Sequence, residues 1–138
     1  GTISCFQLDR QSSALAAGLH RIGLRRGDHL ALACRNHREF VVATIAAAKA
    51  GLGVVYLNTS FGAPQLNDVL AREDVAGLVI DAALFDLIDV DAFDGPIVVV
   101  DGHVESTSTE SSVHHVADVR AGNTFRLPLR ASLPVPPV

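Results

Sequence analysis

The sequence contains no methionine and no tryptophan, and it has a single tyrosine and a single lysine, Lys49. A chain without an initiator methionine is expected to be a processed or truncated piece of a longer protein. Cysteines are also few. Cys5 and Cys34 lie far apart, each among apolar residues, which favours buried free thiols over a disulfide and a reducing, cytoplasmic location.

Cationic stripes and long apolar runs are missing as well. The formal net charge is −4, and no cluster of basic residues is available to pair with phosphates of nucleic acid, so nucleic acid is not an expected partner. No apolar run approaches the roughly 18–20 residues that cross a bilayer, so no transmembrane segment is expected. No secretory signal opens the sequence.

What is present is the composition of a folded domain. Of the 138 residues, 49% are hydrophobic and 19% charged, which allows a packed core in one domain of ordinary size. The hydrophobic pattern alternates between strands and helices. The expected strands are 3–8, 29–34, 54–57, 78–80 and 97–100, and the expected helices are 10–22 (capped by Asp9), 36–50, 64–73 and 82–88.

This alternation predicts an α/β fold with a mostly parallel sheet flanked by helices and four or five strands. The pattern changes near His103. Residues 105–112 form a polar run that reads as a solvated loop, and the C-terminal segment has four prolines in its last eleven residues. We therefore expect an α/β subdomain over residues 1–102 and, over residues 103–138, a polar loop and an extended Pro-rich linker leading to a downstream region.

The segment from Cys34 to Asn58 carries the most conspicuous polar residues. Asn36 and Glu39 have the spacing of a helix cap and a capping-box acid. The pair Gly51-Leu-Gly53 follows a helix and precedes a strand, the reverse of a dinucleotide fingerprint, so it reads as a helix stop. Both the loop around Asn36 and the loop at Asn58 follow strand ends, where open α/β sheets place ligands. A binding role therefore stays open for either loop.

Other chemical motifs are absent or weak. The sequence has no H-E-x-x-H pattern, no Walker loop and no G-x-S-x-G elbow. The adjacent pair His114-His115 has no Cys or carboxylate at ligand spacing, which favours a solvated loop over a metal site. The acids near residue 90 have no EF-hand spacing and read as a polar rim: Asp86, Asp89, Asp91 and Asp94.

The order of these pieces resembles the N-terminal region of AMP-forming acyl-CoA synthetases, the adenylate-forming superfamily that includes fatty-acyl ligases and luciferases. The matching pieces are, in order, QLD (7–9), SALAAGLHRIGLRRGD, HLALACRNHREF, ATIAAAKAGLGVVYLN, TSFGAPQLNDVLARE and VAGLVID. They cover about the first hundred residues. The resemblance implies a Rossmann-like N-terminal subdomain of a fatty-acid–CoA ligase.

In that family a fatty acid and ATP, with Mg²⁺, give an acyl-adenylate and pyrophosphate, and coenzyme A then takes the acyl group. The family's phosphate loop, adenine-site motif, ribose-binding Asp and catalytic lysine have no match here. The resemblance thus implies an inactive scaffold without catalytic, cofactor-binding or metal residues in this chain. The positions that do match are structural: Asp28, Asn36, Glu39, Gly51 and Asn58.

Alternatives stay open from the sequence. The chain is compatible with a degenerate, non-enzymatic interaction module or with part of a fatty-acyl-AMP ligase that does not use coenzyme A. A flavodoxin-like domain that binds a small nucleotide is a further, weaker reading. The expected partners are the remainder of the parent chain, the fatty acid substrate of the parent and, through an exposed apolar face, a second copy of the chain.

Overall fold

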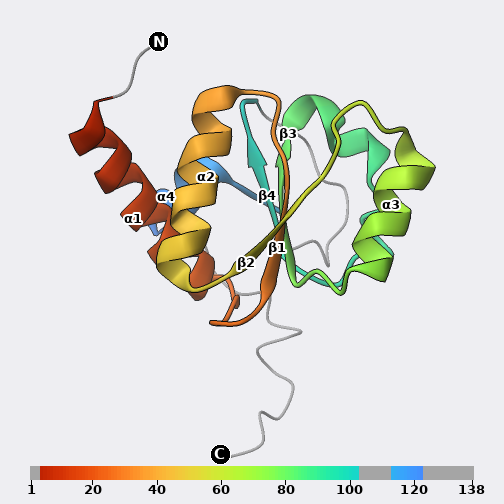
Figure 1. Cartoon of the computed structure of the whole chain (residues 1–138), viewed down its shortest axis with the longest axis horizontal. Helices are drawn as coiled ribbons and strands as arrows, with labels where there is room; N and C mark the ends of the chain where they lie inside the picture. Colours follow the sequence, from red (N-terminus) through yellow and green to blue (C-terminus); the bar gives the residue numbers. More distant parts are fainter. Residues whose placement is uncertain (1–3, 103–112, 123–138) are drawn as a thin grey trace, which may run out of the picture.

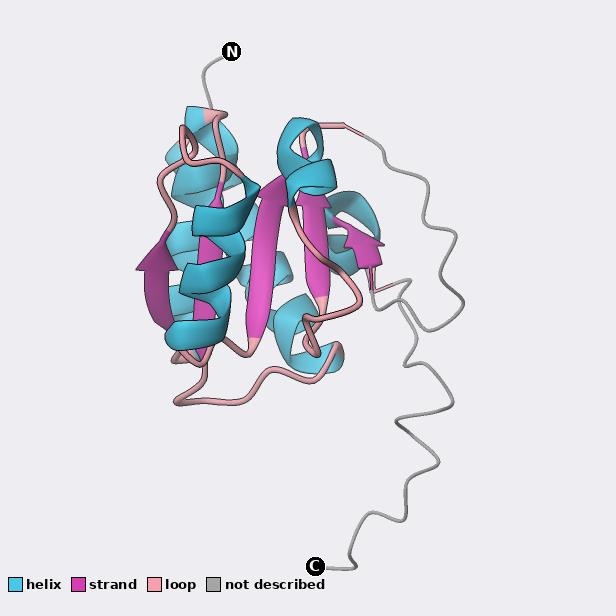
Figure 2. Cartoon of the chain, turned by 90° about the vertical axis from the view of Figure 1, so that its right-hand side faces the viewer, coloured by secondary structure: helices cyan, strands magenta, loops and turns pink. Residues whose placement is uncertain are grey.

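The structure, a computed structural model, describes residues 4–102 and 113–122. Within these residues, five parallel strands form one sheet in the order β2-β1-β3-β4-β5 (Figures 1 and 2). The elements are α1 (Cys5–Arg21), β1 (His29–Ala33), α2 (His37–Ala50), β2 (Gly53–Tyr56), α3 (Ala63–Arg72), β3 (Gly77–Asp81), the 3₁₀ helix η1 (Ala82–Leu87), β4 (Ile97–Val100), β5 (Val113–His115) and α4 (Val116–Ala121). The predicted α/β class and parallel sheet are confirmed.

The sheet lies between two helical layers. Figure 1 shows α1, α2 and α4 on one side of the strands and α3 with η1 on the other. The inner strands β1, β3 and β4 are covered on both faces and carry almost no exposed residue, as expected for parallel strands. The strand order reverses between β1 and β3, the position at which ligands commonly bind in folds with this order.

Small side chains bring α2 close to the sheet. Ala43, Ala46, Ala47 and Ala50 are fully or almost fully buried in the core that α2 shares with α1 and α4. Alanine has high helix propensity and little bulk, so the helix axis can approach the strands. The other core is formed by α3, η1 and the opposite face of the strands, with Leu66, Leu78 and Ile80 completely buried.

The first helix begins earlier than the sequence predicted. The expected strand at 3–8 and the Asp9 cap are wrong, because α1 already begins at Cys5. Ser4 is the N-cap: its hydroxyl accepts from Gln7 N at 3.1 Å, and Gln7 Oε1 accepts from Ser4 N at 3.1 Å, which completes a capping box. Cys5 is exposed on this first turn and is not a buried thiol, although both cysteines are free as expected.

The end of the sheet was also missed. Residues 113–122, which the sequence analysis left without a strand or helix, add β5 beside β4 and then α4. His114 and His115 therefore lie in a half-buried strand and not in a solvated loop. Burial lowers the pKa of His114 below its ordinary value; Asp118 opposes this shift and His115 adds to it.

Two expectations fall outside the described residues: the polar run at 105–112 and the Pro-rich segment at the C-terminal end. The described helices include none that is both long and apolar enough to cross a membrane. Residues 4–102 and 113–122 thus contribute to a single layered unit that presents its loops at the two edges of the sheet (Figure 2).

Candidate functional site at the carboxyl edge of the sheet

The carboxyl ends of the parallel strands form the edge at which this type of fold places ligands. The first loop on this edge joins β1 to α2. Asn36 caps α2, and its Oδ1 accepts from the backbone N–H of Arg38 at 2.9 Å and of Glu39 at 3.4 Å. The predicted cap is present, and it satisfies two of the amides that a helix N-terminus leaves without partners.

Glu39 has a different role from the predicted one. The geometry of a capping box is not found at this helix start. Instead, Glu39 Oε2 lies 3.9 Å from Arg120 Nη1 on α4, with both side chains mostly buried. The carboxylate therefore connects α2 to the last described helix, a long-range contact for which the local sequence gives no signal.

The neighbouring strand β3 ends with a buried carboxylate, and η1 begins at the next residue. Asp81 is 4% exposed, and its Oδ1 accepts from Ala83 N at 2.9 Å, so it caps η1 as Asn36 caps α2. Sequence reasoning missed this residue as a cap. The signal was available, because an aspartate between an apolar strand and a short helical segment has the N-cap pattern.

Cys34 follows β1 on the same edge. Burial first, and then the charges of Glu39 and Asp81, raise the pKa of its thiol to about 12. A thiol with such a pKa stays protonated at neutral pH, whereas nucleophilic attack and metal binding require the thiolate. Cys34 is thus a packing residue, with its Sγ 4.0 Å from the Val79 carbonyl oxygen.

The loop after β2 holds Asn58. Its Oδ1 accepts from Ser60 N at 2.9 Å and from Ser60 Oγ at 2.6 Å, and its carbonyl accepts from Phe61 N at 3.0 Å. This arrangement is a side-chain-stabilised turn of the kind that asparagine favours. The amide oxygen of Asn58 is engaged by its own loop.

The other two singled-out residues lie at the opposite, amino-terminal edge. Asp28 accepts from Arg25 N at 2.8 Å and closes the turn before β1. Gly51 ends α2 with φ +77°, and its carbonyl accepts from Gly27 N at 2.9 Å. The structure therefore brings Asp28 and Gly51 to one edge and places Asn36, Glu39 and Asn58 at the other.

The described carboxyl edge holds no cluster of ligands for the Mg²⁺ that the resemblance implies together with ATP. The helix starts of α2 and η1 at this edge are already capped by Asn36 and Asp81, whereas α3 begins after Gly62 without a side-chain cap. Within residues 4–102 and 113–122, no three His, Cys, Asp or Glu side chains are grouped as metal ligands. The only lysine, Lys49, binds Asp9 and Ser13 on α1 instead. No reaction step can be derived from these residues.

Comparison with known proteins shows the family to which this chain belongs. Residues 1–131 match the sequence profile of the family described as AMP-binding enzyme, which is almost the whole chain. The chain belongs to the AMP-binding enzyme family. The resemblance drawn from the ordered sequence pieces is thereby confirmed, together with the relation to acyl-CoA ligases.

Individual members show the same relation. The chain is 36% identical over 73 residues to the mitochondrial medium-chain acyl-CoA ligase ACSF2 of Rattus norvegicus, a match that covers 53% of this chain and 12% of that ligase. Its fold matches coronafacic acid ligase from Pectobacterium brasiliense with a TM-score of 0.74 at 17% identity, covering 88% of this chain and 25% of the other.

A long-chain-fatty-acid-CoA ligase from Archaeoglobus fulgidus gives a TM-score of 0.73 at 19% identity and covers 87% of this chain and 23% of the other. At these identities the structural matches show a shared fold. The chain spans only 12% to 25% of the length of these three proteins.

Proposed function

We propose that this chain forms the first α/β subdomain of an ATP-dependent fatty-acid–CoA ligase and supports chemistry performed by other parts of that enzyme. The observation that carries the proposal is the family match over residues 1–131. In the whole ligase, a fatty acid carboxylate attacks the α-phosphorus of ATP, pyrophosphate leaves, and the thiol of coenzyme A then displaces AMP from the acyl-adenylate. Mg²⁺ accompanies the ATP.

The role of the chain in this proposal is structural. Asn36, Asp81 and Asn58 direct their polar atoms to neighbouring backbone groups. Cys34 is held as a neutral thiol. These loops therefore fix the shape of the carboxyl edge without supplying an acid, a base or a nucleophile, and we infer that the 138-residue chain by itself does not form acyl-adenylate.

The first experiment is ATP–pyrophosphate exchange with octanoate and with palmitate as carboxylic acids. We expect no exchange by the 138-residue chain. If the parent gene encodes further residues, we expect a Ser/Thr/Gly-rich loop ending in Pro-Lys within about thirty codons, since the family's charge-neutralising groups must come from outside this chain. The longer product should then catalyse the exchange.

A second measurement separates the two ligase types. The longer product is assayed for acyl-CoA with and without coenzyme A, with formation of AMP followed in both. If acyl-adenylate accumulates and does not react with coenzyme A, the parent enzyme is an acyl-AMP ligase and not a CoA ligase. Exchange catalysed by the 138-residue chain itself would contradict the scaffold role.

A further inference from the structure

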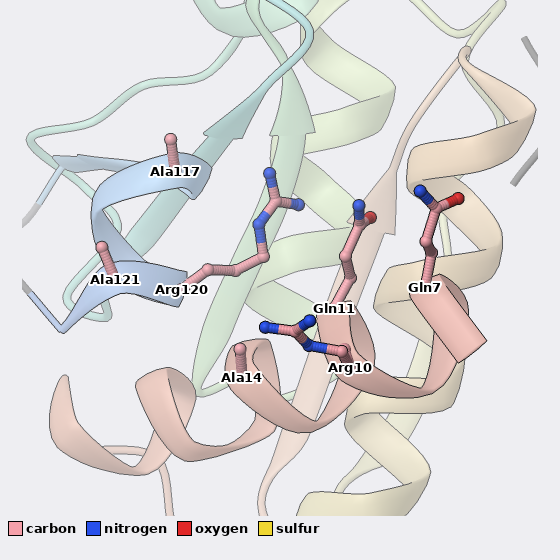
Figure 3. Close-up of a pocket in the computed structure, with 7 residues that line it drawn as sticks. All are labelled: Gln7, Arg10, Gln11, Ala14, Ala117, Arg120 and Ala121. Carbon is pink, nitrogen blue, oxygen red and sulfur yellow. The ribbon is translucent and has the colours of Figure 1, made fainter. Parts of the chain in front are cut away.

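A groove with a volume of about 460 Å³ runs between α1 and α4 (Figure 3). Its described lining consists of Gln7, Arg10, Gln11 and Ala14 from α1 and Ala117, Arg120 and Ala121 from α4. Three alanines give the groove its width, because a longer side chain at these positions would fill it. The volume is in the range of small-molecule sites.

Each polar side chain of this lining carries hydrogen-bond donors that an anion can use, and the Gln7 carboxamide oxygen is already engaged by Ser4 N. Two guanidinium and two carboxamide groups face the groove, and none of its described lining residues is acidic. Figure 3 shows Arg10 and Gln11 projecting from α1, and Arg120 projecting toward them from α4. In a protein with a formal net charge of −4, this local excess of cationic donors is opposite in sign to the whole.

Arg120 has an unused donor. Its Nη1 is buried and has no hydrogen-bond acceptor among the described residues. Glu39 Oε2 is the nearest acid, but at 3.9 Å the contact is an ion pair without a hydrogen bond. A buried donor without an acceptor is unfavourable, so this guanidinium is not fully satisfied by Glu39. The Arg120 side chain is 24% exposed and lines the groove, so the rest of the guanidinium can meet an acceptor there.

Arg10 lies on the opposite wall. Its guanidinium carbon is 5.6 Å from the centre of the Phe6 ring on the same helix. This cation–π contact restricts the side chain without consuming its hydrogen-bond donors. Two cationic groups are thus presented from two different helices toward one space.

We propose that the α1/α4 groove, defined by Gln7, Arg10, Gln11 and Arg120, binds the phosphate group of a phosphorylated small molecule. A phosphate dianion has three acceptor oxygens, which suits two guanidinium forks and a carboxamide acting from two walls. A carboxylate has two oxygens and is saturated by a single guanidinium. The site is separate from the adenylation chemistry proposed above and does not depend on it.

The test is a titration of the ¹⁵N-labelled 138-residue chain with sodium pyrophosphate, sodium phosphate and sodium acetate at constant ionic strength. Arginine Nε–H and glutamine side-chain resonances are followed by NMR. We expect saturable shifts at Arg10, Gln11 and Arg120, with an affinity of about 1 mM for pyrophosphate and weaker binding of acetate. Acetate binding as tightly as pyrophosphate overturns the choice of phosphate.

Variants make the test specific. Arg10→Gln and Arg120→Gln should each weaken pyrophosphate binding about tenfold, the effect of losing one charge-assisted contact. Arg72→Gln is the matched control, because Arg72 is an exposed arginine on α3 in the other helical layer. An equal loss in Arg72→Gln, or shifts that never saturate, overturns the proposal.

Glu39→Gln separates a ligand site from a merely structural ion pair. This variant removes the carboxylate that competes for Arg120, so pyrophosphate should bind more tightly than to the wild type. If Arg120 only forms the ion pair with Glu39, the variant leaves pyrophosphate binding unchanged. That result contradicts the proposal. Arg10→Gln does not touch this ion pair, so it remains informative even if the Arg120 variant fails to fold.

Discussion

Gly18 on α1 lies directly against Val119 on α4, and this contact sets how closely the two helices approach. A Cβ atom at Gly18 would overlap the Val119 carbonyl oxygen and come within 2.5 Å of Val119 Cγ1. The carbonyl belongs to the backbone and cannot turn away. The glycine is therefore required for close packing and not for an unusual backbone angle.

Gly18→Ala tests this relationship, because helix propensity and packing predict opposite signs. In a helix interior, glycine to alanine ordinarily stabilises by about 1 kcal/mol. Here we expect destabilisation of about 1–3 kcal/mol from overpacking against α4. Urea denaturation followed by circular dichroism measures the difference. Ala17→Gly, at an exposed position of the same helix, is the control and should show only the propensity loss. A more stable Gly18→Ala protein would refute the contact.

Asn36→Ala should lower the free energy of unfolding by about 1 kcal/mol, since two backbone amides of α2 lose their acceptor. Asn36→Asp keeps an acceptor oxygen and places a negative charge at the helix N-terminus, so it should retain the wild-type stability. Thermal or urea unfolding of the three proteins provides the measurement. Equal stability of the alanine and wild-type proteins would show that the cap is not used.

The two cysteines should react at very different rates. Iodoacetamide at pH 8 is expected to alkylate the exposed Cys5 rapidly and Cys34 slowly, because the pKa of Cys34 is about 12 and little thiolate is present. Cys5→Ser and Cys34→Ala identify each rate by mass spectrometry. Equally fast modification of both thiols in the folded protein would contradict the burial of Cys34.

The same pKa gives a pH dependence of stability. The Cys34 pKa rises from 9.0 to about 12 on folding, so between these values the folded state holds a proton that the unfolded state has lost. Stability is therefore full below pH 9.0 and falls as the pH rises toward 12. Cys34→Ala should show a smaller fall over this window, measured by urea denaturation at several pH values.

Self-association is expected from the exposed apolar side chains. Phe6, Tyr56 and Phe61 are 69%, 55% and 38% exposed, and Tyr56 belongs to the edge strand β2. Unpaired edge strands with large apolar residues favour pairing between chains. Sedimentation velocity should detect dimers or larger species that Tyr56→Lys reduces. Gln65→Lys, an exposed position on α3, controls for the added charge. A wild-type protein that stays strictly monomeric at high concentration would contradict this prediction.

Local signals were sufficient for the centre of the fold. The strands β1, β2, β3 and β4 were predicted from short apolar runs, and α2 from its cap at Asn36 and its stop at Gly51. Each signal depends on a few neighbouring residues and the geometry of one helix end or strand. These local signals can be read from the sequence because the rest of the fold does not change the conformation that they favour.

The ends of the fold were harder for a physical reason. The segment at 3–8 has β-prone residues, yet the Ser4–Gln7 capping box begins α1 at Cys5. Later in the same helix, Leu15 and Leu19 pack in the core. At the other end, β5 has only three residues and exists as a strand because β4 supplies its hydrogen-bond partners. Neither outcome follows from propensity alone.

By itself, the sequence determined the parallel α/β class, the family and the local roles of Asn36 and Gly51, because periodicity, helix caps and helix stops are short-range properties. Only the tertiary structure decided that Glu39 pairs with Arg120 and that Val119 packs against Gly18. It also gathered two arginines and two glutamines around one groove. These relationships join α4 to helices near the start of the chain, and contacts between such distant residues form only when the sheet brings them together.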